Sequence, residues 1–154
     1  MKKKLLIGLF ILVLCACLTG CGDGSFTMVC NPEGSNEDGI KSSSVITYYF
    51  NKDQLATGYT AITDYEFEEK EVYDTHIKST QETVDSNKEE NVEFKLDKND
   101  SKKSFKFTMT IKNLDKEAKT DEEKENLKAS NVWKTNKETK SNCTLKGISE
   151  DKLK

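Results

Sequence analysis

Apolar and polar residues alternate along much of the chain between residues 26 and 112, which is the pattern of strands with one buried face. Phe26, Met28 and Cys30 share one side of the first run. The alternation is clearest from Phe105 to Ile111, where lysine and threonine fill the intervening positions. The pattern predicts strands over residues 26–30, 40–50, 55–67, 92–97, 105–112 and 141–148.

Two stretches change to a helical period. Between residues 68 and 85, Tyr73, Ile77 and Thr80 are spaced four and three positions apart, which predicts an amphipathic helix with a polar outer surface. A second helix is predicted from Thr120, because the hydroxyl of Thr120 and the carboxylate of Glu123 have the spacing of a capping box. Its apolar content is thin, so we expect it to lie across an edge of the sheet, with Trp133 anchoring the segment beyond it.

These elements predict an α+β fold. We expect an antiparallel sheet of about five or six strands, built from two hairpins, with two helices packed on one face or edge. Residues 26–148 then form a single domain, and residues 149–154 are expected to be a frayed C-terminus.

The first 20 residues differ from the rest of the chain. Lys2, Lys3 and Lys4 form a positive start, and the apolar run from Leu5 to Leu18 is interrupted only by Gly8. A run of 14 residues is short for a membrane-spanning helix, which needs about 20, but suits the apolar region of a secretory signal peptide.

The run ends in Leu18-Thr19-Gly20-Cys21, which resembles the lipobox of bacterial lipoproteins. The resemblance implies that a lipoprotein signal peptidase recognises Leu18, Thr19 and Gly20 and cuts before Cys21. The Cys21 thiol would carry a diacylglycerol thioether, and a further acyl chain such as palmitate on the freed amine is left open. The alternatives are an ordinary secretory signal or a short anchor helix, and Leu14-Cys15-Ala16-Cys17 is a weaker second lipobox.

The expected organisation follows from this cleavage. Residues 1–20 are the signal peptide that is removed, and residues 21–25 are a short tether, of which the four after Cys21 span at most about 14 Å. Two or three acyl chains hold a protein firmly in a bilayer, where one binds only marginally. We therefore expect the membrane to be reached through the lipid on Cys21, with the domain on the outer face of the cytoplasmic membrane.

Composition narrows the class of protein. After residue 20 the chain holds 21 basic and 27 acidic residues, a net charge near −6, and no arginine. An acidic domain of this size argues against a multidomain enzyme, a polytopic membrane protein and a nucleic-acid binder with a basic patch. The exclusive use of lysine suits a low-GC Gram-positive bacterium.

Two cysteines remain in the domain once the leader is removed and Cys21 is lipidated. Cys30 ends the first predicted strand and Cys143 lies in the last one. An even pair in a compartment that permits disulfides favours a Cys30–Cys143 bridge. Two free thiols are the alternative.

No catalytic constellation is visible in the sequence. His76 is the only histidine in the chain, so it is the single histidine candidate for a general base. Its place on the predicted helix favours a histidine on the flank of the helix over a catalytic one. We predict no catalytic residue, no metal site and no cofactor. Tyr48, Tyr49, Tyr59 and Tyr65 favour core packing over a surface platform for glycan or peptide.

The lipobox, the two hairpins around a helix and the acidic Lys/Glu-rich body are similar to small bacterial lipoproteins of the YehR-like kind. That resemblance carries no active-site residues across. We expect a monomeric, non-enzymatic binding or structural module whose partner is an envelope protein or a glycan. The alternatives are an envelope enzyme or accessory subunit that uses acidic residues, and a small solute-binding protein.

Overall fold

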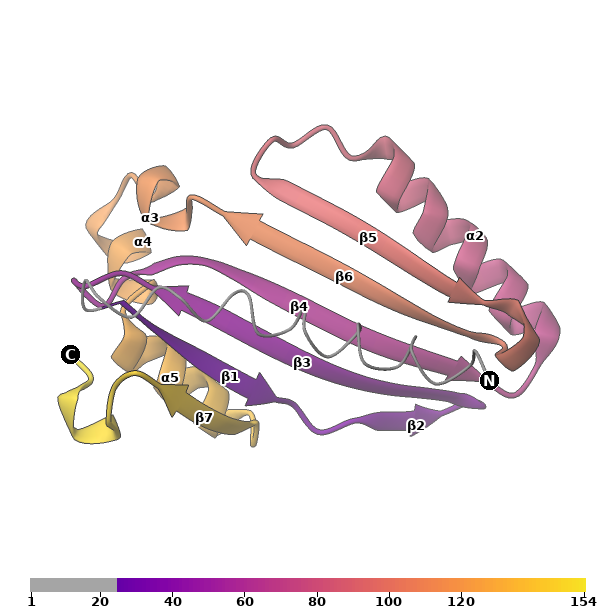
Figure 1. The fold of residues 1–154 in the computed structure, drawn as a ribbon, viewed down its shortest axis with the longest axis horizontal. Coiled ribbons are helices and arrows are strands. Elements are labelled where there is room, and N and C mark those ends of the chain that lie inside the picture. Colours follow the sequence, from indigo (N-terminus) through magenta and orange to yellow (C-terminus); the bar gives the residue numbers. More distant parts are fainter. Residues whose placement is uncertain (1–24) are drawn as a thin grey trace, which may run out of the picture.

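The computed structural model describes residues 25–154, so the leader, the lipobox and most of the tether lie outside the described residues (Figure 1). The strands are β1 (Phe26–Asn31), β2 (Ser35–Glu37), β3 (Ile40–Phe50), β4 (Ala56–Phe67), β5 (Val92–Asn99), β6 (Ser104–Lys112) and β7 (Asn142–Lys146). The helices are α2 (Lys70–Ser86), α3 (Leu114–Glu117), α4 (Asp121–Asn126) and α5 (Ala129–Glu138), with 3-10 turns η1 (Asp100–Lys102) and η2 (Glu150–Lys152). The predicted α+β class is confirmed.

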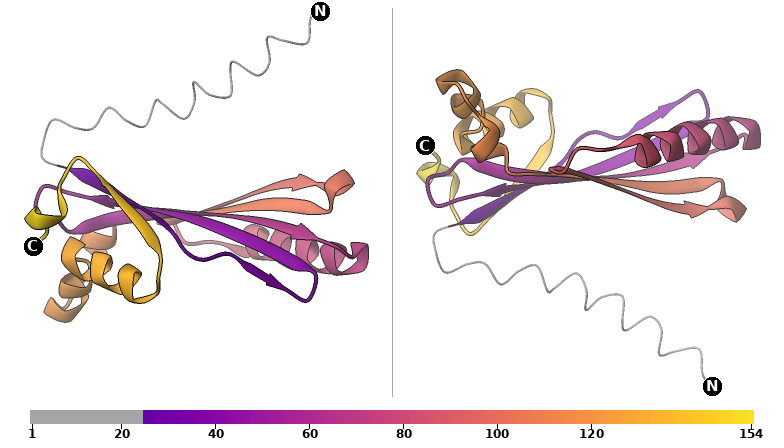
Figure 2. Two further views of the ribbon diagram at one scale, coloured as in Figure 1. Left: turned by 90° about the horizontal axis from the view of Figure 1, so that it is seen from below. Right: turned by 90° about the horizontal axis from the view of Figure 1, so that it is seen from above.

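All strand pairs are antiparallel, and the order across the sheet is β5-β6-β4-β3-β1-β7, with β2 paired to β3. The two predicted hairpins, β3–β4 and β5–β6, lie side by side because β4 pairs with β6 across the intervening helix α2. Figure 2 shows a strongly twisted sheet with α2 and α5 on the same side of it.

One face of the sheet carries most of the apolar side chains, and the register explains this. Met28, Tyr48, Tyr59, Ile111 and Val92 are successive partners across five strands, and directly opposed residues point to the same face. We call this the covered face, because α2 and α5 pack on it, and the opposite side the open face (Figure 2). Tyr48 packs against the α5 side of the core, whereas Tyr49 lies on the open face and is 39% exposed. The expected core packing is therefore wrong for Tyr49, because adjacent residues of a strand point to opposite faces.

The core is divided into two clusters at opposite ends of the covered face. The α5 cluster contains Met28, Cys30 and Phe50 together with Ala129 of the helix. The α2 cluster is smaller and contains only three buried residues, Phe67, Tyr73 and Phe105. Since the low hydrophobic content is split in this way, much of the covered face between the clusters is only half-buried.

Three details differ from the sequence prediction. The helix predicted from Thr120 is two helices, since residues 127–129 pair with residues 54–56: Ala56 N donates to Leu127 O at 2.9 Å and Ala129 N to Gln54 O at 2.9 Å. Between the predicted strands 26–30 and 40–50, where no strand was predicted, the structure contains the short strand β2. It is joined to β3 by a turn at Asp38 and Gly39, which both have positive φ.

The third difference is at the C-terminus, where residues 149–154 are ordered against the domain. Gln54 Nε2 donates to Lys152 O at 2.8 Å, and Lys154 N donates to Gln54 Oε1 at 2.7 Å. Leu153 packs against the α5 cluster. The expectation of a frayed end was wrong, because one glutamine side chain takes up backbone groups that would otherwise be exposed to water.

Candidate functional site

The structure joins the two cysteines of the domain. Cys30 and Cys143 are direct partners in the β1–β7 register and form a disulfide with an S–S distance of 2.08 Å. Cys30 is fully buried in the α5 cluster. This agrees with the pairing expected from the sequence and ties the first and last strands of the domain together. Leu18, Thr19, Gly20 and Cys21 lie outside the described residues.

The open face carries a broad polar hollow of about 500 Å³ near the ends of β4, β5 and β6. Asp64, Glu66, Asp97 and Lys106 line it, and Lys106 Nζ lies 3.5 Å from Asp64 Oδ1. The side chains of Asp64 and Asp97 are 54% and 51% exposed. Because both carboxylates are hydrated, they lack the desolvated setting that prepares an acid for general acid–base chemistry.

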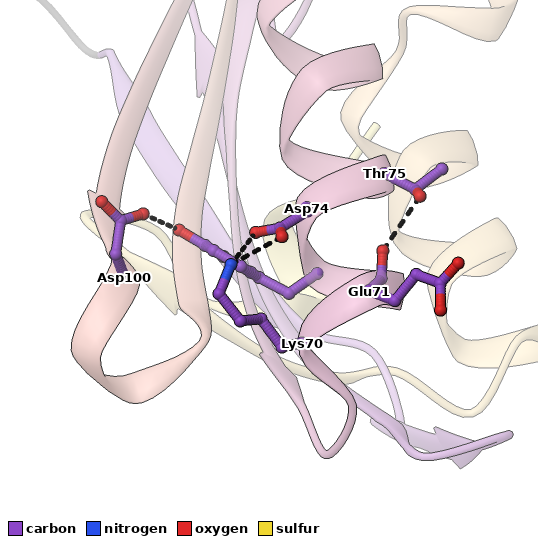
Figure 3. Close-up of polar contacts among 6 residues, drawn as sticks. Lys70, Glu71, Asp74, Thr75 and Asp100 are labelled. Atoms are coloured by element: carbon purple, nitrogen blue, oxygen red, sulfur yellow. Dashed lines mark hydrogen bonds and ion pairs between the residues drawn. The ribbon is translucent and has the colours of Figure 1, made fainter.

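The outer surface of α2 forms a second, very shallow hollow. Lys70 Nζ donates to both carboxylate oxygens of Asp74, at 2.8 and 2.6 Å, and the Thr75 hydroxyl donates to Glu71 O at 2.9 Å (Figure 3). Both contacts are ordinary helix-surface interactions, and exposed pairs of this kind contribute about 0.3–0.5 kcal/mol. This surface therefore gives α2 some local support and shows no built site.

Tyr73 fixes the N-terminal half of α2 to the sheet. It is only 2% exposed, and its hydroxyl donates to Asp100 Oδ1 at 2.5 Å on the turn after β5. Burial, followed by the hydrogen bond to the Asp100 carboxylate and that carboxylate's negative charge, raises the pKa of Tyr73 to about 12. The neutral phenol therefore serves as the donor that holds the helix in place.

A third hollow lies between α2 and the covered face, with a volume of about 290 Å³. The sheet supplies aromatic rings and the helix supplies hydroxyls and the imidazole. The lining residues are Tyr65, His76, Ser79, Thr80, Thr83, Phe105 and Phe107. We call this space the α2 cavity. It differs from the two other hollows because its lining contains no Asp, Glu, Lys or Arg.

His76 lies on α2, as the sequence predicted, and its side chain is exposed at the edge of the α2 cavity. Its ring centre is 5.2 Å from that of Phe67, with the planes tilted by 42°. Within residues 25–154 its imidazole makes no hydrogen bond and no ion pair with a carboxylate. The described residues thus provide no partner that would orient it as a general base.

The α2 cavity was not predicted from the sequence, although the positions that form it were assigned to the inner side of the helix. Tyr73 and Ile77 pack on the sheet as expected, whereas Thr80 lines the cavity instead of filling it. The available signal was the side-chain type: a threonine in an apolar stripe fills less space than the leucine or isoleucine that would close it.

Among residues 25–154, no group of three or more His, Cys, Asp or Glu side chains is placed to hold a metal ion. In the same range, none of the helices combines the length and the apolar character that crossing a bilayer requires.

The chain was also compared with known proteins. No family model matches the sequence, and neither the curated proteins nor the solved structures include a significantly similar one. The resemblance to YehR-like lipoproteins therefore stays a prediction from the sequence pattern.

Proposed function

We propose that this protein is an extracytoplasmic lipoprotein, anchored through lipid on Cys21 and acting as a non-enzymatic binding module at the outer face of the cytoplasmic membrane. The observation that carries the proposal is the sequence Leu18-Thr19-Gly20-Cys21 directly after an apolar run of signal-peptide length. The first strand begins at Phe26, so four residues, 22–25, separate Cys21 from the folded domain.

The disulfide supports the proposed location. Bridges such as Cys30–Cys143 form and persist in oxidising compartments outside the cytoplasm and are rare inside it. A cross-strand bridge between the first and last strands also suits a small domain whose core is divided, because its two buried clusters alone hold few large side chains.

In the fold, the α2 cavity and the start of β1, which follows the proposed anchor, lie at opposite ends of the sheet. Phe26 begins β1 at the end of the sheet where β3 finishes at Phe50, and β3 runs from there over 11 residues, about 36 Å, to its start at Ile40. Phe67 pairs with Ile40 and so lies at the far end, with the α2 cluster around it. The α2 cavity would then be near the end that is furthest from the membrane, where a partner in the envelope can reach it.

Metabolic labelling with a fatty-acid analogue tests the anchor. The wild type and Cys17→Ala are expected to be labelled and to fractionate with membranes, since Cys17 lies in the part that is removed. Cys21→Ala is expected to lose the label. Equal labelling of Cys21→Ala and the wild type would refute the proposal, because the lipid would then be attached elsewhere.

The binding role has a separate test. Crosslinking in living cells, followed by purification of the anchored protein, is expected to recover one partner in constant proportion. Cys21→Ala is the matched control, because it keeps the domain and loses the location. Recovery of the same partner with that variant would show that anchoring is not needed for the interaction.

A further inference from the structure

The α2 cavity has an aromatic base that the fold holds rigidly. Phe105 is 4% exposed, and its ring centre lies 4.9 Å from that of Tyr65 and 5.6 Å from that of Phe67. Phe107, next on the same face of β6, contacts Phe94 at 5.4 Å between ring centres. These contacts fix the rings, so the base of the cavity needs no rearrangement to receive a flat apolar surface.

The wall of the cavity has unused hydrogen-bonding capacity. Within residues 25–154, the Ser79 hydroxyl and the His76 imidazole of this wall form no hydrogen bonds, and neither does the Tyr65 hydroxyl at the base. Thr80 donates to His76 O at 2.8 Å and Thr83 to Ser79 O at 3.1 Å, and each hydroxyl oxygen keeps its capacity to accept. The wall therefore offers both donors and acceptors.

Charge separates this cavity from the other two hollows. None of its seven lining residues is Asp, Glu, Lys or Arg, whereas the open-face hollow and the α2 surface each carry both acids and lysines. A charged ligand would find no carboxylate, ammonium or guanidinium group here to replace its hydration. The lining thus selects for a neutral molecule.

The way α2 is attached explains why the space stays open. Tyr73 is the only buried residue of this 17-residue helix, and it lies near the N-terminal end. Beyond Ile77, Thr80 and Thr83 line the cavity, and a threonine side chain fills less space than a leucine or isoleucine would. The helix is held at one end and leaves the cavity beneath its middle part.

From this combination we propose that the α2 cavity binds a neutral sugar ring of a glycan, an inference that rests on the proposed binding role. The C–H bonds on one side of a pyranose are slightly positive and suit the negative faces of aromatic rings. Its hydroxyl groups suit the donors and acceptors of the helix wall. The Phe107 ring supplies the stacking surface, and Thr80 supplies a hydrogen bond to a sugar hydroxyl.

Titration calorimetry on the full chain tests this, in a detergent without a sugar headgroup. The probes are two neutral trisaccharides, N-acetylglucosamine trisaccharide and cellotriose, with indole as an apolar probe. We expect saturable one-to-one binding of at least one sugar with a Kd below about 1 mM. Phe107→Leu keeps an apolar side chain without the ring, and Thr80→Val keeps the shape without the hydroxyl. Each is expected to weaken sugar binding by about 2- to 10-fold.

The chain offers a matched control for each variant. Thr75 makes the same hydroxyl-to-carbonyl contact as Thr80 but lies on the outer surface of α2 (Figure 3), so Thr75→Val is expected to leave the sugar Kd unchanged. Tyr49 is the exposed tyrosine of the open face, so Tyr49→Leu is also expected to leave it unchanged.

Three results would overturn the inference. The first is that neither sugar binds at a concentration 10-fold above the expected Kd limit. The second is that Tyr49→Leu weakens sugar binding as much as Phe107→Leu does. The third is that indole binds more tightly than either sugar. Circular dichroism of each variant checks that it folds. Because lipidation at Cys21 is measured independently, a negative result here with a labelled protein rejects the sugar site and leaves the anchored module standing.

Discussion

Breaking the disulfide is the perturbation whose effect the structure fixes best. Cys30 and Cys143 are 113 residues apart in sequence and directly opposed on adjacent strands. The bridge therefore closes nearly the whole domain into one loop, which restricts the unfolded chain far more than a local bridge would. Reduction of the wild type removes this restriction without removing any side chain.

The chain-entropy relation gives the magnitude. For a closed loop of 113 residues it yields about 4–5 kcal/mol of stabilisation at 25 °C. That is a large part of the 5–15 kcal/mol that typically separates folded from unfolded domains. For about 130 ordered residues it corresponds to a fall of about 15 °C in Tm.

The assay is thermal unfolding followed by circular dichroism, with and without a phosphine reductant. The oxidised wild type is expected to unfold about 15 °C above the reduced wild type. The double variant Cys30→Ala/Cys143→Ala is the control, and its Tm is expected to be the same with and without the reductant. Alkylation of both thiols in unreduced, denatured protein, or an identical Tm with and without reductant, would refute the reasoning.

Four further substitutions test single contacts. Tyr73→Phe removes the hydrogen bond to Asp100 and is expected to lower the unfolding free energy in urea by about 1.5–3 kcal/mol, and Asp100→Asn is expected to lose less. Because the pKa of Tyr73 is raised to about 12 in the folded state, its contribution to the unfolding free energy is complete below pH 10 and is lost as pH rises toward 12. If the unfolding free energy of Tyr73→Phe fell as steeply as that of the wild type over this pH range, the reasoning would be contradicted. Thr120→Ala removes the cap of α4 and is expected to cost about 1 kcal/mol, seen as faster amide exchange in that helix alone. Gly58→Ala would place a Cβ well inside van der Waals distance of Ile111 O, so it is expected to lower the unfolding free energy by about 1–3 kcal/mol, and an unchanged value would show that the strands separate freely there.

Much of the local structure follows from side-chain periodicity. The alternation from Phe105 to Ile111 places its apolar residues on the covered face, and the capping box of Thr120 and Glu123 forms as predicted. The helix predicted over residues 68–85 is observed as Lys70–Ser86. These elements depend on neighbours within a few positions, so the sequence pattern is enough to find them.

The errors arise where contacts between residues far apart in the sequence determine the local structure. The break between α4 and α5 is set by backbone pairing with residues 54–56, and the ordered C-terminus is set by the Gln54 side chain. Neither of these contacts changes the local pattern of apolar and polar residues. The strand β2 is different, since the Asp38-Gly39 pair is a recognised hairpin signal and was available from the sequence.

The candidate site was harder to predict than the fold. The base of the α2 cavity joins Tyr65 of β4 to Phe105 and Phe107 of β6, and that juxtaposition needs the β4–β6 pairing. No local pattern specifies which hairpin lies beside which. The disulfide pairing was predictable because only two cysteines lie within the predicted domain.

The anchor is the central claim, and the mass of the mature N-terminus tests it most directly. Protein extracted from membranes and digested is expected to yield an N-terminal peptide that begins at Cys21 and carries a diacylglycerol thioether. An N-terminal peptide that begins at any other residue, or an unmodified Cys21 in protein recovered from the culture medium, would contradict the account.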